Sequence, residues 1–181
     1  MTLPLIVILA LVIGSVTGDS HPPAPKAADP TAVLSFAAPP SADADAAPCA
    51  KVLAQLPIVL TGLSQRVVHT KPDTPFVVAW GSPAIVLRCG VGRPKDLSEG
   101  SAAQFIQGGV AGGPFYDVQR DGNANVYTTV DRAAYVSITI PGEYQGADKL
   151  PTLSQAIANV LPAVCDANGA APAETRCTRR K

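Results

Sequence analysis

The sequence predicts an α+β fold, in which a mostly antiparallel sheet carries two terminal helices packed on one face as a two-layer sandwich. Apolar residues recur at helical spacing after Pro48 and after Lys149. Between these stretches lie short runs rich in β-branched residues, separated by turns that contain Gly and Pro. Strands joined by short turns must be mostly antiparallel, and helices at both ends of the chain can cover one sheet face.

Residues 1–18 have the character of a signal peptide or a membrane anchor. Residues 3–16 are apolar and uncharged. A run of about 14 residues is short for a bilayer span and suits the core of a signal peptide. Small residues precede Asp19, where cleavage would fall, although no Lys or Arg precedes the run. Cleavage of this leader and its retention as an anchor both stay open.

Residues 19–47 predict a disordered tether. They consist largely of Ala, Pro, Asp and Ser. Such a composition cannot bury enough apolar surface to offset the entropy lost on ordering. We interpret the apolar side chains of Val33, Leu34 and Phe36 as incidental, and the imidazole of His21 as solvated.

The predicted disulfide-stapled α+β domain covers residues 48–166. Its first helix begins at residue 48, and its apolar stripe reaches Leu63 with a break at Pro57. The last helix spans residues 150–165, where Leu, Ile and Val recur at helical spacing. Between the helices, β-rich runs predict strands at 66–70, 76–80, 84–89, 104–107, 115–119, 125–131 and 134–141.

Alternation along the strands predicts which side chains face the core. Val136, Ile138 and Ile140 point to one side of their strand. In the strand that ends on Cys89, that residue points to the core side and Arg88 points away from it. In the strand before residue 134, we expect the valines to oppose the tyrosine and the threonine.

The polar side of the sheet is a candidate binding face. Alternation by itself predicts an ordinary solvent face there, and this is the interpretation we prefer. The alternative is a binding surface, because aromatic and hydroxyl groups beside an arginine can hold sugar, peptide or phosphate groups. Its candidate residues are Trp80, Arg88, Tyr127, Thr129, Tyr135 and Ser137, with Thr139 beside them.

The four cysteines predict a disulfide framework, because their number is even and an export signal precedes them. Cys49 opens the first helix and Cys165 closes the last, so antiparallel packing of the helices would bring this pair together. Elimination then pairs Cys89 with Cys177. The alternative leaves Cys89 as a buried free thiol, with Cys177 free or bonded between molecules.

Three stretches of the sequence carry a resemblance to a known family. They are "PCAKVLAQLP", "AWGSPAIVLRCGVGRP" and "YTTVDRAAYVSITIP", followed by a late helix that ends in a cysteine. Over residues 48–166 the chain resembles the actinobacterial secreted family catalogued as domain of unknown function 3515. The resemblance implies an N-terminal hydrophobic segment, export to or across the membrane, and no established activity. The family has a further cysteine near the position of Phe105, so the resemblance assigns no partner to Cys89.

Composition disfavours a nucleic-acid partner and a metal site. Lys and Arg number 14, Asp and Glu number 14, and aromatic residues make up 5%, so there is neither a basic field nor a stacking surface. His21 and His69 lack zinc-ligand spacing to any cysteine. The oxygen-bearing residues from Asp121 suit an Asp-Gly hairpin better than a calcium loop. We therefore expect no metal and no cofactor.

Catalysis is uncertain and is the less favoured class. A thiol enzyme could use Cys89 with His69, and an envelope-acting hydrolase could use surface carboxylates. The carboxylate candidates are Asp117, Asp121, Asp131 and Glu143.

We expect instead a non-catalytic binding or structural module of the cell envelope. It would be secreted, or anchored at the outer face of the plasma membrane through its N-terminal segment. Its partner would be an envelope glycan, peptide or lipid. Residues 167–181 form a flexible basic tail that could touch anionic lipid or cell-wall phosphate, although such an end is more often solvated.

Overall fold

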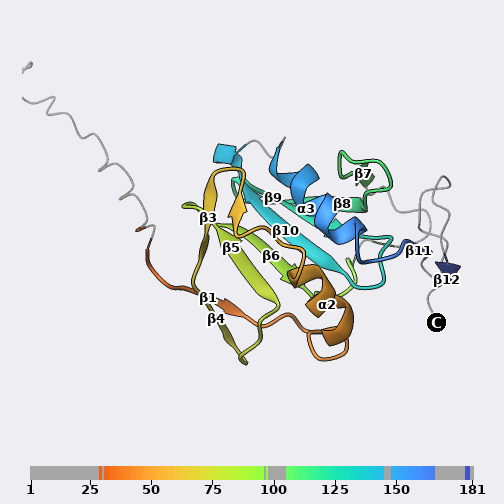
Figure 1. The fold of residues 1–181 in the computed structure, drawn as a ribbon, viewed down its shortest axis with the longest axis horizontal. Coiled ribbons are helices and arrows are strands. Elements are labelled where there is room, and N and C mark those ends of the chain that lie inside the picture. The colour runs from red at the N-terminus through yellow and green to blue at the C-terminus, as the bar shows by residue number, and fades with distance from the viewer. Residues whose placement is uncertain are drawn as a thin grey trace, which may run out of the picture.

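The described residues form an eight-stranded sheet with two helices, which confirms the α+β class (Figure 1). The structure is a computed structural model that describes residues 29, 31–95, 97, 105–144, 148–165 and 178–179. Its helices are α2 (Ala46–Leu53), the 3-10 turn η1 (Gly142–Tyr144) and α3 (Lys149–Ala158). Its strands are β1 (Leu34–Ala37), β2 (Val59–Leu60), β3 (Leu63–Arg66), β4 (Val68–Lys71), β5 (Val77–Trp80), β6 (Ile85–Cys89), β7 (Phe105–Gln107), β8 (Phe115–Asp121), β9 (Ala124–Thr129), β10 (Val136–Pro141), β11 (Val164–Cys165) and β12 (Thr178–Arg179).

The main sheet is antiparallel between all of its neighbouring strands. Its order is β2-β3-β5-β6-β10-β9-β8-β7. Short turns join β5 to β6 and β8 to β9, and each contains a glycine with positive φ, Gly81 at 73° and Gly122 at 58°. The second turn confirms the hairpin predicted at Asp121-Gly122. Two smaller pairs, β1 with β4 and β11 with β12, are parallel.

The largest hydrophobic cluster lies on one face of this sheet. Register places Ile138 of β10 between Leu87 of β6 and Tyr127 of β9, so these three side chains share a face. Both helices add buried residues to the same cluster, including Val52 from α2 and Ile157 from α3. Full burial of such a side chain stabilises the fold by about 1.5–3 kcal/mol. The inward orientation predicted for Val136, Ile138 and Ile140 is confirmed, since all three are buried here.

The two helices are shorter than predicted. α2 ends at Leu53, and the stripe residues Leu60 and Leu63 belong instead to β2 and β3. α3 ends at Ala158, so Cys165 lies in β11 and not in the last helical turn. Pro57 and Pro162 stand in the segments that follow the helices, where a proline removes a helical hydrogen bond.

The prediction of a disordered tether is wrong for residues 31–47. β1 lies in this range and pairs with β4, with Leu34 opposite Val68. Leu34 and Phe36 pack in a second hydrophobic cluster formed by Val77, Ala79 and Val86. Composition could not reveal this strand, because its hydrogen bonds and its apolar contacts come from residues far along the chain. Residues 19–28 and Pro30 lie outside the described residues.

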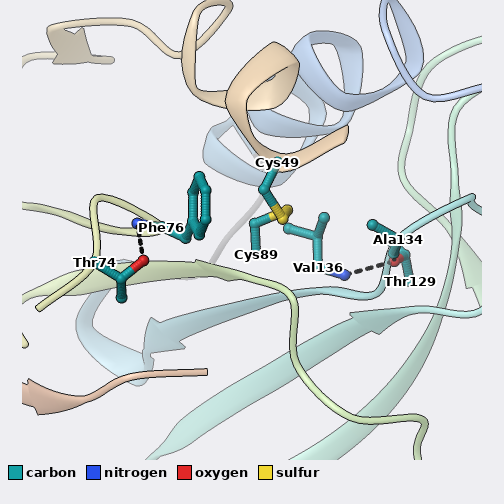
Figure 2. The surroundings of a disulfide bond; sticks show 7 residues. All are labelled: Cys49, Thr74, Phe76, Cys89, Thr129, Ala134 and Val136. Atoms are coloured by element: carbon teal, nitrogen blue, oxygen red, sulfur yellow. Dashed lines mark hydrogen bonds between the residues drawn. A yellow bond between two sulfur atoms is a disulfide. The ribbon is translucent and has the colours of Figure 1, made fainter. Parts of the chain in front are cut away.

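The disulfide pairing predicted from the helices is also wrong. Cys49 in α2 is bonded to Cys89 at the end of β6, with an S–S distance of 2.01 Å (Figure 2). Both cysteines are fully buried, and Val136 of β10 lies beside them. Because α3 ends early, Cys165 does not occupy the helical end that the prediction gave it. The bond also excludes the predicted pairing of Cys89 with Cys177. Cys177 and the side chain of Cys165 lie outside the described residues.

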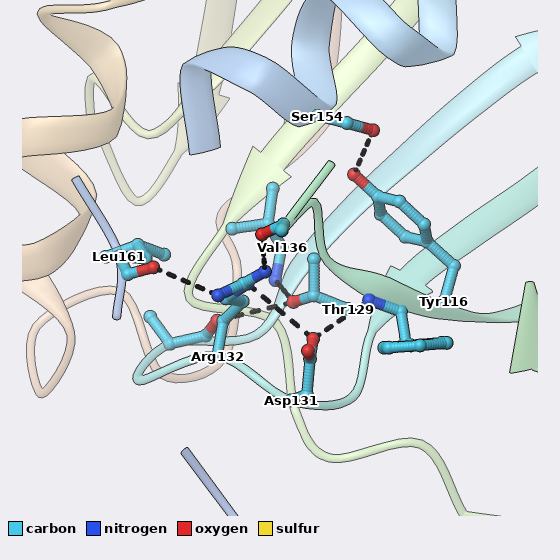
Figure 3. Close-up of polar contacts among 10 residues, drawn as sticks. Tyr116, Thr129, Asp131, Arg132, Val136, Ser154 and Leu161 are labelled. Carbon is cyan, nitrogen blue, oxygen red and sulfur yellow. Dashed lines mark hydrogen bonds and ion pairs between the residues drawn. The ribbon is translucent and has the colours of Figure 1, made fainter. Parts of the chain in front are cut away.

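Buried polar groups hold the end of α3 against the sheet (Figure 3). The Arg132 guanidinium donates to the carbonyl oxygens of Gly112 (2.7 Å) and Leu161 (3.4 Å), and it lies 3.6 Å from the Asp131 carboxylate. Asp131 in turn accepts a 2.9 Å bond from the backbone N–H of Phe115. The pair therefore connects the start of β8, the 108–114 loop and the chain after α3.

Candidate functional site

The predicted binding face does not exist as one surface. Trp80 is fully buried in the main cluster, and its indole N–H donates a 2.8 Å bond to the carbonyl of Pro57. Thr129 is also fully buried, and its hydroxyl accepts from the backbone N–H of Val136 and donates to the carbonyl of Ala134. The prediction placed these groups in solvent, so it is wrong for both residues.

Tyr127 and Tyr135 are covered for different reasons. Tyr127 stands opposite Ile138 and therefore faces the main cluster, where its ring meets that of Tyr116 edge-on at 6.1 Å. The predicted sides of this strand are thus reversed, because Tyr127 faces the main cluster and Val126 lines the polar side. Tyr135 does lie on the polar side by alternation, but Leu97 and Val130 bury it in a third cluster.

Arg88 and Ser137 line a groove on the polar side of the sheet. Its volume is about 540 Å³. Register makes Ser137 of β10 the direct neighbour of Arg88 on β6 and of Thr128 on β9. The guanidinium and two hydroxyl groups therefore stand in one row across three adjacent strands. The lining residues are Arg88, Val91, Gly92, Arg93, Pro94, Lys95, Gln119, Asp121, Val126, Thr128, Ser137 and Thr139.

The groove is cationic although the whole chain has a formal net charge of +0. Its lining includes three cations, Arg88, Arg93 and Lys95, and one carboxylate, Asp121. Hydroxyl groups stand between them on the sheet floor. A concave site that gathers one sign of charge concentrates counter-charged ligands there.

Phe36 of β1 positions Arg88. The guanidinium carbon lies 5.1 Å from the centroid of the Phe36 ring, a cation–π contact. Phe36 is itself held by packing against the strand pair β5–β6. The N-terminal strand therefore orients the arginine at one end of the groove.

The loop after β6 forms the wall that carries the other two cations. Leu97 is buried against Val130 and Tyr135, which fixes the loop to the sheet. The Arg93 guanidinium donates a 2.6 Å bond to the Leu97 carbonyl. This anchoring brings Arg93 and Lys95 to the rim above the hydroxyl row.

The four candidate carboxylates have separate surroundings. Asp117 is buried and accepts a 3.0 Å bond from the Gln119 amide. Burial raises the pKa of Asp131 above its ordinary value, against the opposing effect of the Arg132 guanidinium. Asp121 lies at the groove, and Glu143 is exposed in η1.

Cys89 cannot serve as the nucleophile of a thiol enzyme. Its sulfur is bonded to Cys49 and lies on the core side of β6. His69 is exposed on β4 and lines a hollow of about 880 Å³ with Lys71 and Asp73. The predicted alternative that paired Cys89 with His69 is therefore overturned by the disulfide.

The described part of the chain has neither a metal-ligand cluster nor a helix of membrane-spanning character. Those residues hold no group of three or more His, Cys, Asp or Glu that could bind a metal ion. Among the same residues, no helix is both long and apolar enough to cross a membrane. The disulfide indicates an oxidising, non-cytoplasmic environment.

One family model matches the chain over residues 1–165, and its description is "Protein of unknown function (DUF3515)". The chain belongs to the DUF3515 family. No curated protein and no solved structure matches this DUF3515 protein. The match covers every element from β1 to β11, including the strands that form the groove.

Sequence reasoning missed most of the groove of this DUF3515 protein. Arg93 and Lys95 stand in the short loop after β6, and the sequence analysis gave neither of them a role. The available signal was their spacing, two basic residues within seven positions of Arg88 on one connection. Thr128 was missed because the valines of β9 were expected to face the core, which would turn its hydroxyl away from Arg88.

Proposed function

We propose that this DUF3515 protein is a non-catalytic binding module of the cell envelope that holds an anionic ligand in the groove. The observation that carries this proposal is the convergence of Arg88, Arg93 and Lys95 over a floor of hydroxyl groups, in a chain without net charge. The ligand class is a phosphate- or carboxylate-bearing component of the envelope.

The chemistry of the lining matches such a ligand. A guanidinium offers paired N–H donors to phosphate or carboxylate oxygens, and a lysine adds a point charge. The hydroxyl groups of Thr128, Ser137 and Thr139 can donate to oxygen atoms of the same ligand. Contact with Phe36 keeps Arg88 in one orientation before binding, which lowers the entropy lost when the ligand docks.

The proposed location is the outer face of the plasma membrane of an actinobacterium. Support comes from the buried disulfide, from the apolar residues 3–16 and from the family match over residues 1–165. In this proposal the N-terminal segment acts as signal peptide or anchor. The two helices cover one face of the sheet, and the groove occupies part of the opposite face, beside the second and third hydrophobic clusters.

Binding of two anionic probes tests the function. Isothermal titration calorimetry would measure the full chain against a poly(glycerol phosphate) and against a carboxylate-bearing peptidoglycan fragment. We expect saturable binding of one of them, and the one that binds identifies the anionic group. Arg88→Gln and Lys95→Gln should each weaken binding about tenfold or more, because a hydrogen bond to a charged group contributes about 1.5–3 kcal/mol.

A matched variant separates the groove from general charge attraction. Lys51→Gln removes one positive charge from the exposed surface of α2. It should bind both probes as the wild type does. Equal loss in Lys51→Gln and Lys95→Gln would reject the groove as the site, and so would wild-type affinity in Arg88→Gln.

A further inference from the structure

The exposed aliphatic side chains of this protein are concentrated in one place. Among the described residues, five large apolar side chains are exposed: Val33, Ile58, Val59, Val67 and Ile106. The first four belong to neighbouring segments, and we call them the aliphatic patch. Ile106 lies on β7, at the opposite edge of the main sheet from β2.

Backbone hydrogen bonds show that the members of the patch are neighbours. The N–H of Gln65 donates to the carbonyl of Ile58. Gln65 lies two residues before Val67, so Ile58 and Val67 lie on adjoining segments. The N–H of Leu34 donates to the carbonyl of Val67, so the chain at Val33 runs beside it. β2 is a two-residue edge strand, and Val59 is 55% exposed and Ile58 76% exposed. Isolated exposed aliphatic residues are ordinary on a protein surface, whereas four on adjoining backbone segments make this corner of the domain locally apolar.

The same corner is where the chain from the N-terminal apolar run enters the domain. The Arg66 guanidinium donates to the carbonyls of Asp29 (3.1 Å), Ala32 (2.6 Å) and Gly81 (2.8 Å). These bonds fix the entering chain beside the aliphatic patch. Residues 17–28 separate the apolar run from this point, and twelve residues reach at most about 43 Å when fully extended.

We propose that the aliphatic patch rests on the lipid bilayer that holds residues 3–16. This inference uses the membrane anchoring of the proposed function but not its ligand groove. The short connection keeps the patch at a high effective concentration near the bilayer. The patch is wholly aliphatic, whereas the residues that dominate protein–protein binding are mostly Trp, Tyr and Arg. Aliphatic side chains gain free energy when they enter the boundary of the acyl chains.

Quenching of tryptophan fluorescence by brominated lipid tests this orientation. Ile58→Trp would be introduced into the full chain, which is then reconstituted in phosphatidylglycerol–phosphatidylcholine vesicles with brominated acyl chains. Emission from the buried Trp80 of the wild type gives the baseline. The matched control is Ile106→Trp, because it carries the same tether at the opposite sheet edge. We expect loss of emission from Ile58→Trp and unchanged emission from Ile106→Trp.

Three outcomes would overturn the proposal. Equal quenching of both variants would mean that the domain has no preferred orientation on the bilayer. A blue shift of Ile58→Trp that depends on protein concentration and not on bromination would assign the patch to a second copy of the chain. Failure of the full chain to float with the vesicles would contradict the membrane anchoring on which this proposal rests. The groove-binding experiment does not depend on that result.

Discussion

Cys49 in α2 is bonded to Cys89 at the end of β6, and both residues are fully buried in the main hydrophobic cluster. The bond closes a loop with a sequence separation of 40 residues. It therefore joins the first described helix to the centre of the sheet, on β6, the strand that also carries Arg88.

Removal of this bond should lower the free energy of unfolding by about 4 kcal/mol, the value that the chain-entropy model gives for a loop of this length. Cys49→Ala with Cys89→Ala is the suitable double variant, because alanine adds no polar atom to a buried site. Urea denaturation measures the loss. Wild-type protein treated with reductant should show a similar loss, and mapping that joined Cys49 to Cys165 would contradict the pairing.

Asp131→Asn should make the free energy of unfolding less dependent on pH. Burial raises the pKa of Asp131, so the folded state binds this proton more tightly than the unfolded state does. The stability that the Asp131 carboxyl contributes is fully present below pH 3.8, the ordinary pKa of an aspartate. It is lost as the pH rises through the raised pKa of the folded state. The amide keeps an acceptor for the Phe115 N–H without carrying a charge. Denaturation from pH 3 to pH 8 should show the wild type losing stability relative to the variant as the pH rises, and a relative gain of the wild type with rising pH would refute the assignment.

Arg132→Met should lower the free energy of unfolding. It leaves the Asp131 carboxylate buried without this guanidinium and removes the bonds to the carbonyls of Gly112 and Leu161. Breaking a buried ion pair by removing one partner costs about 3–5 kcal/mol. The loss, measured by urea denaturation at pH 7, should be smaller at pH 4, where Asp131 can take up a proton. A loss that does not depend on pH would show that the carbonyl bonds alone are responsible.

Gly108→Ala should destabilise the contact between β8 and α3. A Cβ at this position would meet the Ser154 hydroxyl and, at 2.8 Å, the Tyr116 ring. These two side chains form a buried 2.9 Å hydrogen bond, so both would have to move. Overpacking of this kind costs about 1–3 kcal/mol. Gly92→Ala is the control, because its nearest contact is 3.9 Å from Pro40, and thermal unfolding should place it within about 0.5 kcal/mol of the wild type.

Trp80→Phe should lower stability and leave anion binding unchanged. The variant loses buried apolar volume and leaves the carbonyl of Pro57 without its 2.8 Å donor. Together these effects cost about 2 kcal/mol. Calorimetry with the anionic probe that binds the wild type supplies the second measurement. A large loss of affinity in a folded Trp80→Phe protein would show that Trp80 contributes to anion binding.

Elements with local signals could be predicted from the amino-acid sequence. The strands near residues 77–80, 85–89 and 136–141 and the Asp121-Gly122 hairpin were predicted from alternation and turn chemistry, and the structure confirms them. The inward orientation of Cys89 and the outward orientation of Arg88 also follow from alternation within one strand. These features need no knowledge of which strand lies beside which.

Three features depend on contacts between segments that are far apart in the sequence. They are the pairing of the cysteines, the pairing of β1 with β4 and the set of residues that line the groove. The side-chain period of a strand is two, so a shift of one residue in register moves every side chain to the other face. The register of β9 against β10 therefore turned Tyr127 and Thr129 toward the main cluster and placed Thr128 beside Ser137. In the same way, Cys49 meets Cys89 because α2 packs over the end of β6, a contact between segments that share no local pattern.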